Sequence, residues 1–312
     1  MRISPARGRL AWRTSLNSIE HLGELSSDIR KSVVGMIHAA RMGHMGGSLS
    51  SVDILVSLYF HSMRCGPANW GDPARDHFIM SKGHSVEGFY AVLARAGFFP
   101  EAALADYGRF GGMLYGHPTL KVPGVEIPSG SLGHGLAVGV GMALAAKRDG
   151  LPSRVFVLMG DGEQAEGSVW EAAMAAAHYG LDNLVAIVDA NGLQISGPVA
   201  KVMNSGPLTA KYASFGWATR EVDGHDHAAL TAAFDETPWK PGAPNFLLAR
   251  TRKGRGVSFM ENDASWHHRT PTDEEYGRAL AELGARRGVE AAAVDRGAAG
   301  AVDAAAGKGG LR

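Results

Sequence analysis

The sequence predicts an α/β fold with a mainly parallel sheet and helices on both faces. Short apolar runs, each long enough for one buried strand, occur at 155–159 and 184–188. The segment between them, 167–179, is rich in alanine and places its apolar residues on one helical face. Units of this kind leave the loops after the strands at the carboxyl edge of the sheet, where α/β proteins bind ligands.

The composition suits one large domain or two small ones and argues against several kinds of partner. The chain has 312 residues, with Lys+Arg and Asp+Glu both at 31, so no net charge draws it toward nucleic acid or membrane. The basic cluster at 250–255 has no interleaved aromatic residues, and no apolar run approaches the length of a membrane span. The single cysteine, Cys65, excludes an internal disulfide and indicates a reducing, cytoplasmic compartment.

We place the domain at 25–283 and treat both ends as separate segments. Residues 1–24 are interpreted as a basic N-terminal arm, because four arginines precede the first acid, Glu20. Transit peptides have a similar composition, but this stretch lacks a clean amphipathic pattern. Residues 284–312 are mostly Ala and Gly, which predicts a frayed helix followed by a disordered tail.

Two helices separated by a histidine loop open the domain. Apolar residues at helical spacing predict the first helix over 25–41. A tight loop is expected at His44–Ser48, because it contains two consecutive glycines. The second helix is expected to begin at Ser51 or Asp53 and to run through Phe60.

Three further loops that combine glycine and histidine lie at the edges of predicted elements. Ser81–His84 follows a short strand at 76–80, and Tyr115–Pro118 comes next along the chain. Gly130–Gly135 opens a helix to about Ala146 that has almost no large polar residues and should be buried. We expect these loops to place polar groups around one cavity.

The stretch 154–193 carries the clearest chemical signal. Asp161 directly follows the first apolar run, and Asn191 and Leu193 follow the second. Their carboxylate, amide and carbonyl oxygens are ligands that suit a divalent cation such as Mg²⁺. Backbone N–H groups around Gly162 and the next helix N-terminus would face the charge of a diphosphate. A plain acidic glycine turn is the structural alternative, and the second motif thirty residues on argues against it.

The last third of the domain is expected to alternate short helices and strands. A short helix is expected at 208–212, and strands at 217–222 and 246–249. His225 is interpreted as part of a structural turn, with Asp226 capping the helix that follows. A glycine loop then leads to the sequence Trp266-His267-His268.

These motifs, in this order, resemble those of the transketolase family. The stretch 154–193 is similar to the thiamine diphosphate motif that transketolases share with deoxyxylulose-phosphate synthases and 2-oxo acid decarboxylating enzymes. Many members carry Asn-Asn where this chain has Ala190-Asn191, so only the second asparagine is kept. The resemblance covers roughly residues 25–280. It implies a thiamine diphosphate-binding fold with thiamine diphosphate and Mg²⁺, Mn²⁺ or Ca²⁺ as cofactors.

The resemblance also implies roles for individual residues. Three histidines with a pKa near neutrality would contact the sugar and move protons: His44, His117 and His267. The cation would be held by Asp161, Asn191 and the carbonyl of Leu193. The cofactor would be bound by His84, Gly130, Ser131, Leu132, Asp161, Gly162, Glu166, Asn191 and His267.

Two of these assignments stay open. The glutamate of the family that matches Glu166 lies near the dimer axis, but an acid in the first turn of a helix is also favoured by the helix dipole. His268 stands where a glycine is more often seen, so either His267 or His268 can be the histidine of the site.

The resemblance spans only half of a transketolase. It therefore implies the N-terminal subunit of a split transketolase, active only with a C-terminal, pyrimidine-binding subunit, in an α₂β₂ assembly. The implied reaction moves a two-carbon ketol unit from a ketose phosphate to an aldose phosphate, as in the pentose phosphate pathway of carbohydrate metabolism. The motifs do not name the donor and acceptor sugars.

Three alternatives belong to other classes. The chain could be the alpha subunit of a 2-oxo acid dehydrogenase, which is also a separate diphosphate-binding subunit. It could resemble a deoxyxylulose-phosphate synthase, although that enzyme normally keeps both halves on one chain. A non-catalytic relative that kept only the fold is the third, and the intact Asp161, Asn191, His84 and His267 argue against it.

Overall fold

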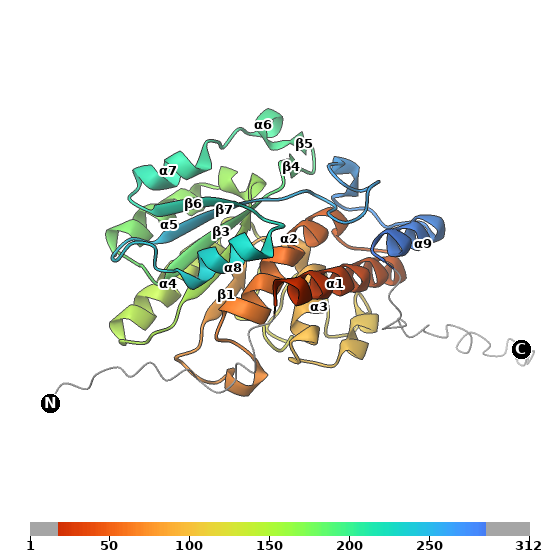
Figure 1. Ribbon diagram of the computed structural model, residues 1–312, viewed down its shortest axis with the longest axis horizontal. Helices are drawn as coiled ribbons and strands as arrows, with labels where there is room; N and C mark the ends of the chain where they lie inside the picture. Colours follow the sequence, from red (N-terminus) through yellow and green to blue (C-terminus); the bar gives the residue numbers. More distant parts are fainter. Residues whose placement is uncertain (1–17, 285–312) are drawn as a thin grey trace, which may run out of the picture.

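The computed structural model describes residues 18–284 and contains a five-stranded sheet in the order β1-β2-β3-β7-β6 (Figure 1). All neighbouring strands are parallel. The α/β fold with a parallel sheet is therefore confirmed. The strands are β1 (His77–Met80), β2 (Val155–Gly160), β3 (Leu184–Ala190), β6 (Ala218–Asp223) and β7 (Asn245–Arg250).

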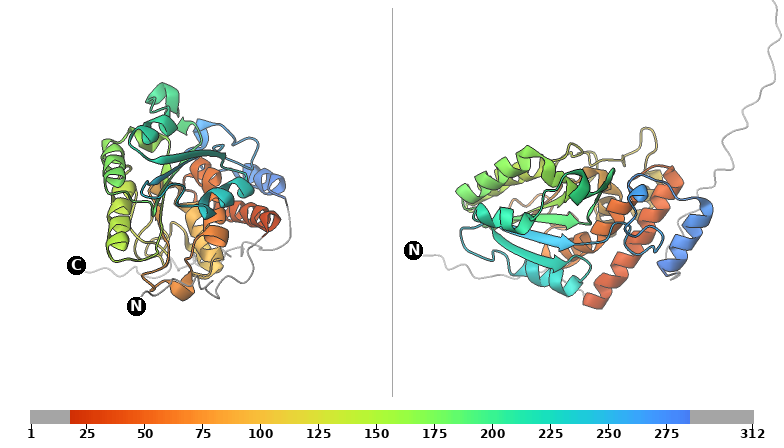
Figure 2. Two further views of the ribbon diagram at one scale, coloured as in Figure 1. Left: turned by 60° about the vertical axis from the view of Figure 1, so that its left-hand side comes forward. Right: turned by 90° about the horizontal axis from the view of Figure 1, so that it is seen from above.

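Helices cover both faces of the sheet, as expected, because residues along each strand alternate between two hydrophobic cores. In β2, Phe156 and Leu158 face the core under α1, α2, α3 and α8, whereas Val155 and Val157 face the core under α4, α5 and α7. Figure 2 shows the sheet between these two layers of helices. The α-helices of the described residues are α1 (Ile19–Ala40), α2 (Met45–Ser57), α3 (Val86–Arg95), α4 (Gly135–Arg148), α5 (Gly167–His178), α6 (Val199–Val202), α7 (Leu208–Ser214), α8 (His227–Asp235) and α9 (Asp273–Glu282).

Helix α1 begins at Ile19, six residues before the predicted start. The Ser18 hydroxyl accepts a hydrogen bond from the His21 N–H at 3.2 Å and caps the helix, and Leu22 is fully buried. The predicted basic arm therefore ends in a helical turn. Its remaining part, 1–17, and the predicted tail at 285–312 lie outside the described residues.

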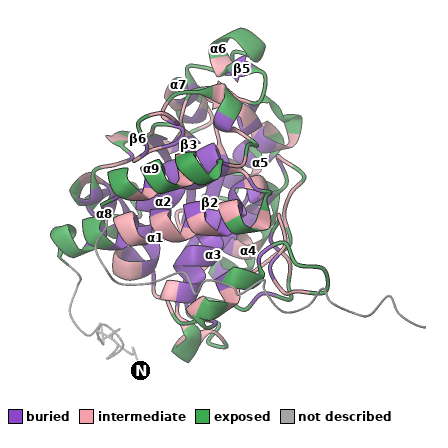
Figure 3. Ribbon diagram, turned by 90° about the vertical axis from the view of Figure 1, so that its right-hand side faces the viewer, coloured by how far each residue is buried: buried purple, intermediate pink, exposed green. Residues whose placement is uncertain are grey.

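Helix α2 begins at Met45, so the predicted loop at His44–Ser48 is wrong beyond His44. The two glycines were expected in a loop, but they lie inside the helix, and neighbouring segments approach them too closely to leave room for a side chain. A side chain on Gly46 would lie 2.7 Å from Cγ of Lys253, and one on Gly47 would meet the Ser85 hydroxyl. The helix is buried along its whole length, in contrast to the exposed α6 and α9 (Figure 3).

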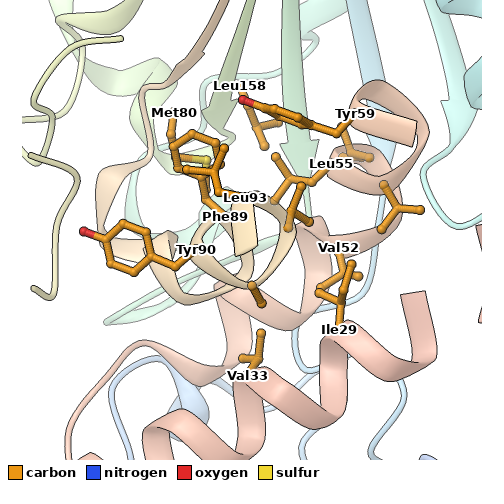
Figure 4. Packing of buried hydrophobic residues seen from close by; sticks show 14 of the residues in the cluster. Ile29, Val33, Val52, Leu55, Tyr59, Met80, Phe89, Tyr90, Leu93 and Leu158 are labelled. Carbon is orange, nitrogen blue, oxygen red and sulfur yellow. The ribbon is translucent and has the colours of Figure 1, made fainter. Parts of the chain in front are cut away.

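The core under α2 is built from several elements that are distant in sequence. Ile29 and Val33 of α1 pack against Val52 and Leu55 of α2, and Phe89 of α3 closes the cluster toward the sheet (Figure 4). This packing holds the N-terminal end of α2 against the carboxyl edge of the sheet, next to the loop after β1.

Most other predicted elements lie within one or two residues of their observed bounds. Asp226 caps α8 by accepting from the Ala228 and Ala229 N–H groups, as expected. A two-stranded hairpin, β4 (Leu193–Gln194) with β5 (Gly197–Pro198), was not predicted. The helix predicted to run through Phe60 continues beyond α2 as a π turn at Leu58–Ser62. Short 3₁₀ turns, also not predicted, occur at Pro67–Asn69, Gly83–Ser85, Glu101–Asp106, Gly162–Ala165 and Ala264–Trp266.

Two expectations from composition can be compared with the structure. Within residues 18–284, no helix is long and apolar enough to cross a membrane. Cys65 is buried, and burial raises the pKa of its thiol to about 12, so it is unreactive at neutral pH.

Candidate active site

The loops after β1, β2, β3 and β7 meet at the carboxyl edge of the sheet around a buried ion pair. Asp189, at the end of β3, is fully buried and accepts hydrogen bonds from the Lys82 ammonium and the Thr251 hydroxyl. It also accepts from the Ser50 hydroxyl of α2 at 2.6 Å. Burial alone would raise the pKa of Asp189, but the Lys82 ammonium holds it below its ordinary value. The pair joins β1, β3, β7 and α2 at one point.

The three predicted metal ligands lie on two loops that touch. Asp161 accepts a hydrogen bond from the Gly192 N–H at 2.6 Å and another from the Gly162 N–H at 2.8 Å. The side-chain oxygen of Asn191 accepts from the Leu193 N–H at 3.1 Å. Burial, with Asp189 nearby, raises the pKa of Asp161 to about 6. A bound cation would lower it again, because an opposite charge favours the ionised carboxylate.

This donor set is one carboxylate, one amide and one backbone carbonyl. Among the described residues, no group of three or more His, Cys, Asp or Glu is placed to hold a metal ion. Oxygen donors of low total charge suit Mg²⁺, Ca²⁺ or Mn²⁺, which complete their coordination with phosphate oxygens and water, better than they suit Zn²⁺ or Cu²⁺. The residues present therefore match a hard cation that arrives with a diphosphate.

The predicted histidines come together, with His44 at the centre. The ring centroid of His44 lies 5.3 Å from that of His84, 6.1 Å from that of His117 and 5.6 Å from that of His267. His84 and His267 stack at 5.3 Å with an interplanar angle of 19°. The sequence-based expectation that these loops surround one site is consistent with this geometry.

The expectation of histidine pKa values near neutrality is wrong for two of the three catalytic candidates. Burial, helped by the charges of neighbouring histidines and Lys253, lowers the pKa of His44 to about 4 and that of His267 to about 3. The same causes, with Lys82, lower the pKa of His84 to about 2. At neutral pH these imidazoles are uncharged, and each has one N–H donor and one acceptor.

Both candidates after Trp266 reach His44, but they differ in their surroundings. The Lys253 ammonium lies 2.8 Å from Nδ1 of His267 and must donate to it, which leaves the proton of the neutral ring on Nε2. His268 is exposed, and its ring centroid lies 4.6 Å from that of His44. The geometry thus gives His267 a fixed tautomer inside the site and places His268 on its solvent side.

Two buried lysines at the site were missed. Lys82 is 1% exposed and Lys253 is 2% exposed, and the Lys253 ammonium also donates to the Leu193 carbonyl at 3.1 Å. Burial and the Lys82 charge lower the pKa of Lys253 to about 8. The sequence did hold a signal in their positions: Lys82 follows a predicted strand by two residues and Lys253 by four, and each precedes a glycine. From the sequence, Lys253 was noted only as a member of the basic cluster at 250–255.

Glu163, and not Glu166, is the glutamate that ties this region together. Glu163 is 2% exposed and accepts from the Gly133 N–H at 2.9 Å, the Gly160 N–H at 3.0 Å and the Ser81 hydroxyl. It therefore holds the 130–135 loop against the ends of β1 and β2. Glu166 is exposed at the start of α5 and makes no capping hydrogen bond. Gly130 contacts the His117 ring so closely that a side chain there would lie 2.8 Å from it.

Several polar atoms in this region are poised for a ligand. Among the described residues, the buried side-chain atoms that make no hydrogen bond include Nδ1 of His44, Oγ of Ser85 and Nε2 of Gln194. Gln194 packs against Gly162, and Ser85 against Gly47. Unsatisfied buried polar groups are costly, so they indicate a site that a polar ligand completes. Together with Lys82 and Lys253, these groups match an anionic ligand such as a diphosphate.

One cavity of the structure lies away from the histidines and lysines described above. A cavity of about 500 Å³ lies beside the ends of β6 and β7, lined by Thr251, Arg252 and Arg255 among others. Arg252 and Arg255 share Glu261, Arg250 pairs with Glu221, and Asp223 also lines the cavity, so its positive and negative charges are nearly balanced. We place the site at the histidines, because the titratable groups with strongly shifted pKa values are there.

Comparison with known proteins identifies relatives along most of the chain. A family model described as "Transketolase, thiamine diphosphate binding domain" matches residues 23–290. One subunit of the apulose-4-phosphate transketolase of Phocaeicola vulgatus is 46% identical over 268 residues, which cover 86% of this chain and 95% of that protein. The 6-deoxy-6-sulfo-D-fructose transketolase subunit SqwG of a Clostridium species is 40% identical, over 82% of this chain and 93% of that protein.

Among solved structures, the transketolase of Campylobacter jejuni superposes with a TM-score of 0.81 at 28% sequence identity. The match covers 86% of this chain but only 43% of that one. The chain is thus similar in length to the subunit relatives and to less than half of the single-chain enzyme.

The ion pair between Lys82 and Asp189 generates a stability prediction. Lys82→Met removes the ammonium and leaves Asp189 buried and unpaired, which should lower the free energy of unfolding by about 3–5 kcal/mol. Urea denaturation of the chain measures this loss. Lys147→Met, which breaks a surface ion pair with Asp182, is the matched control and should cost less than about 1 kcal/mol. Equal losses of unfolding free energy in the two variants would show that the buried ion pair stabilises the fold no more than the surface pair does.

Proposed function

The chain belongs to the transketolase family, and we propose that it is the N-terminal, thiamine diphosphate-binding subunit of a two-chain transketolase. The proposed reaction transfers a two-carbon ketol unit from a ketose phosphate to an aldose phosphate. The observation that carries this proposal is the convergence of the diphosphate-binding groups and the histidines of four loops at one sheet edge. The subunit relatives, which match nearly along their whole length, favour it over a 2-oxo acid dehydrogenase or a deoxyxylulose-phosphate synthase.

We propose that the cofactor diphosphate lies between the two lysines and the loop after β2. Lys82, Lys253 and His84 would face its charge, and the N–H groups near Gly162 would donate to its oxygens. Asp161, Asn191 and the Leu193 carbonyl would hold the Mg²⁺, Mn²⁺ or Ca²⁺ that accompanies it. The loop at Gly130, Ser131 and Leu132 would lie against the cofactor rings. When bound, thiamine diphosphate supplies the carbanion stabilisation that allows a carbon–carbon bond of the sugar to break.

The chain's own contribution at the sugar end would come from neutral histidines. His267 presents an Nε2–H donor because Lys253 occupies its other nitrogen, and it can stabilise developing negative charge on a sugar oxygen. His44 has a free, buried Nδ1 that can bond a donor hydroxyl or take its proton. His117, which is exposed, would assist from the side of Gly130.

We propose that α4 and α5 form the surface that meets the partner chain. Their outer faces expose apolar side chains, including Val138 (38% exposed), Met174 (51%) and Tyr179 (48%). Clustered exposed apolar groups mark interaction sites in soluble proteins. In this proposal a C-terminal, pyrimidine-binding subunit covers this surface, and two such pairs form the α₂β₂ assembly. Glu166, at the start of α5, would lie close to the contact. We assign the protein to the cytoplasm, in keeping with its one buried thiol.

The donor and acceptor are proposed only as sugar phosphates or similar anionic sugars. The relatives named above act, by their names, on apulose 4-phosphate and on 6-deoxy-6-sulfo-D-fructose, so the non-reacting end of the sugar varies among them. The groups that select that end are expected on the partner chain. We further propose one domain whose predicted limits, 25–283, extend at the N-terminal side to Ile19, where α1 begins, flanked by an arm and a tail.

The first prediction concerns the metal. Asp161→Ala removes the one charged ligand, so the affinity for thiamine diphosphate with Mg²⁺ should fall at least about 100-fold, since even changes to groups around a ligand cost 10–100-fold. Calorimetric titration in the presence of the partner measures this affinity. Asp149→Ala, at the exposed end of α4, is the control and should not change it. Unchanged affinity in the Asp161 variant would remove this residue from the site.

The second prediction concerns the histidines. His44→Ala and His267→Ala should each lower kcat by roughly 10²–10⁴-fold, the usual cost of a positioned proton-transfer group, with a much smaller change in cofactor affinity. Steady-state kinetics of the assembled enzyme measures kcat. A loss of that size in His268→Ala, without one in His267→Ala, would move the assignment to the neighbouring residue.

The third prediction is that the chain has no transketolase activity when purified by itself. It carries the diphosphate and sugar-facing groups but spans less than half of the single-chain enzyme, whose other half is expected to supply the carboxylate that activates the cofactor. The assay uses xylulose 5-phosphate and ribose 5-phosphate, first with each of the two chains separately and then with both together. Activity only in the mixture is expected, and full activity of this chain without a partner would contradict the two-chain proposal.

A further inference from the structure

Helix α3 buries a carboxylate that the proposed cofactor and sugar contacts do not use. Glu87, the second residue of α3, has no exposed surface. An isolated carboxylate in such a place is expensive to bury, and burial raises the pKa of Glu87. The structure must therefore offset this cost with specific partners, and those partners indicate what the residue does.

The three donors to Glu87 are two hydroxyls and one backbone N–H. Its Oε1 accepts from the His44 N–H at 2.9 Å and from the Tyr107 hydroxyl at 2.6 Å. Its Oε2 accepts from the Ser48 hydroxyl at 2.6 Å. His44 and Ser48 bracket the first turn of α2, so the carboxylate also lies at the positive end of that helix dipole.

Two glycines make this approach possible. Gly43 has φ +142°, and a side chain on it would lie 2.6 Å from Oε1 of Glu87. A side chain on Gly88 would lie 2.9 Å from the Ser48 carbonyl. Helix α3 can press its first turn against the start of α2 only because neither position carries a side chain.

Within residues 18–284, the hydrogen bonds of His44 are made by its backbone, while its ring makes contacts with other histidine rings. Its side chain makes no capping hydrogen bond, and its Nδ1 is buried without a partner. Its N–H donates to Glu87, and its carbonyl accepts from the Ser48 N–H at 3.2 Å. The position of the ring in the histidine cluster therefore depends on where Glu87 holds this backbone.

The same helix also holds the second histidine segment. The Tyr107 hydroxyl binds Glu87, and Tyr90, one turn further along α3, donates to the His117 carbonyl at 2.9 Å. One oxygen of Glu87, Oε1, thus accepts hydrogen bonds both from the His44 backbone and from Tyr107, which lies on the segment that leads to His117. Helix α3 sets the separation of the two histidines.

We propose that Glu87 is a positioning residue for the reaction, which acts by fixing the backbone of His44, and with it the spacing between His44 and His117, in the sugar-binding part of the site. This inference rests on the proposed function for its kinetic readout. Glu87 is too deeply buried to touch the sugar or the cofactor itself.

The main test is a double-mutant cycle in the enzyme assembled with its partner chain. Glu87→Ala should lower kcat by about 10²-fold, the cost of a misplacement near 1 Å, and should change the cofactor Kd by less than about threefold. In the His44→Ala background the same change should lower kcat by less than about twofold further, because the residue it acts through is gone. If the loss of kcat in the double variant equals the product of the losses in the two single variants, the proposal is overturned.

Two further variants separate positioning from a general structural role. Glu87→Gln keeps an acceptor for the His44 N–H and should recover kcat to within about fivefold of the native chain. Glu126→Gln is the matched control: Glu126 is also largely buried, but it is bound by Arg75 and His77 away from the histidine cluster. It should lower the melting temperature without lowering kcat. An equal loss of kcat in the control would mean that lost stability alone explains the effect.

One measurement does not depend on activity or on a foldable alanine variant. In the full-length chain labelled with ¹³C-histidine, the ring resonances of His44, assigned from their absence in His44→Ala, should shift in Glu87→Ala and in Tyr107→Phe, and stay in place in Glu87→Gln. Unshifted resonances in the folded Tyr107→Phe or Glu87→Ala chain would overturn the inference. An assembled native enzyme without transketolase activity would instead refute the proposed function and leave this result standing.

Discussion

The buried ion pair of Lys82 and Asp189 is the constraint on which the site depends. Two charges removed from water are tolerable only if they pair closely and if other groups satisfy their remaining hydrogen-bonding capacity. The hydroxyls of Ser50, in α2, and Thr251, just after β7, donate these additional hydrogen bonds to Asp189. The pair therefore requires the ends of β1, β3 and β7 and the start of α2 to meet at one point. The loops that carry His84, Asn191 and Lys253 leave from those same ends.

The electrostatics around this pair explain the state of the histidines. Lys82 and Lys253 are nearly inaccessible to solvent, and their positive charges oppose protonation of the rings next to them. Lys82 is paired with Asp189, whereas the Lys253 ammonium contacts two uncharged groups, the Leu193 carbonyl and the His267 ring, so its charge suits an anionic cofactor. A bound cation would lower the pKa of Asp161, and the negative charge of a diphosphate would raise the pKa of the histidines next to it.

Two features of the structure fit the proposal that this chain is one part of a two-chain enzyme. Asp161, Lys82 and Lys253 are buried at the sheet edge, whereas the histidines around His44 are partly buried or exposed, and apolar side chains on the outer faces of α4 and α5 are exposed. A folded subunit with a complete core and an incomplete site fits the two-chain proposal. In that arrangement the cofactor end of the site belongs to this chain, and selection among sugars can change through the partner without disturbing the core.

Local chemistry in the sequence was enough to predict the α/β class, most strand positions and the convergence of Asp161, Asn191 and the Gly-His loops. These features depend on short-range rules, because a buried parallel strand reads as an apolar run and its carboxyl end defines the site. Other features were decided only by contacts between distant segments. Gly46 and Gly47 were expected in a loop but lie in α2. Glycine is required at these positions because Lys253 and Ser85 leave no room for a side chain. The sequence showed Lys253 only as part of a basic cluster, and its burial depends on where the end of β7 places it. The histidine pKa values follow from desolvation and from charges that the fold gathers, neither of which is written in the spacing of residues along the chain.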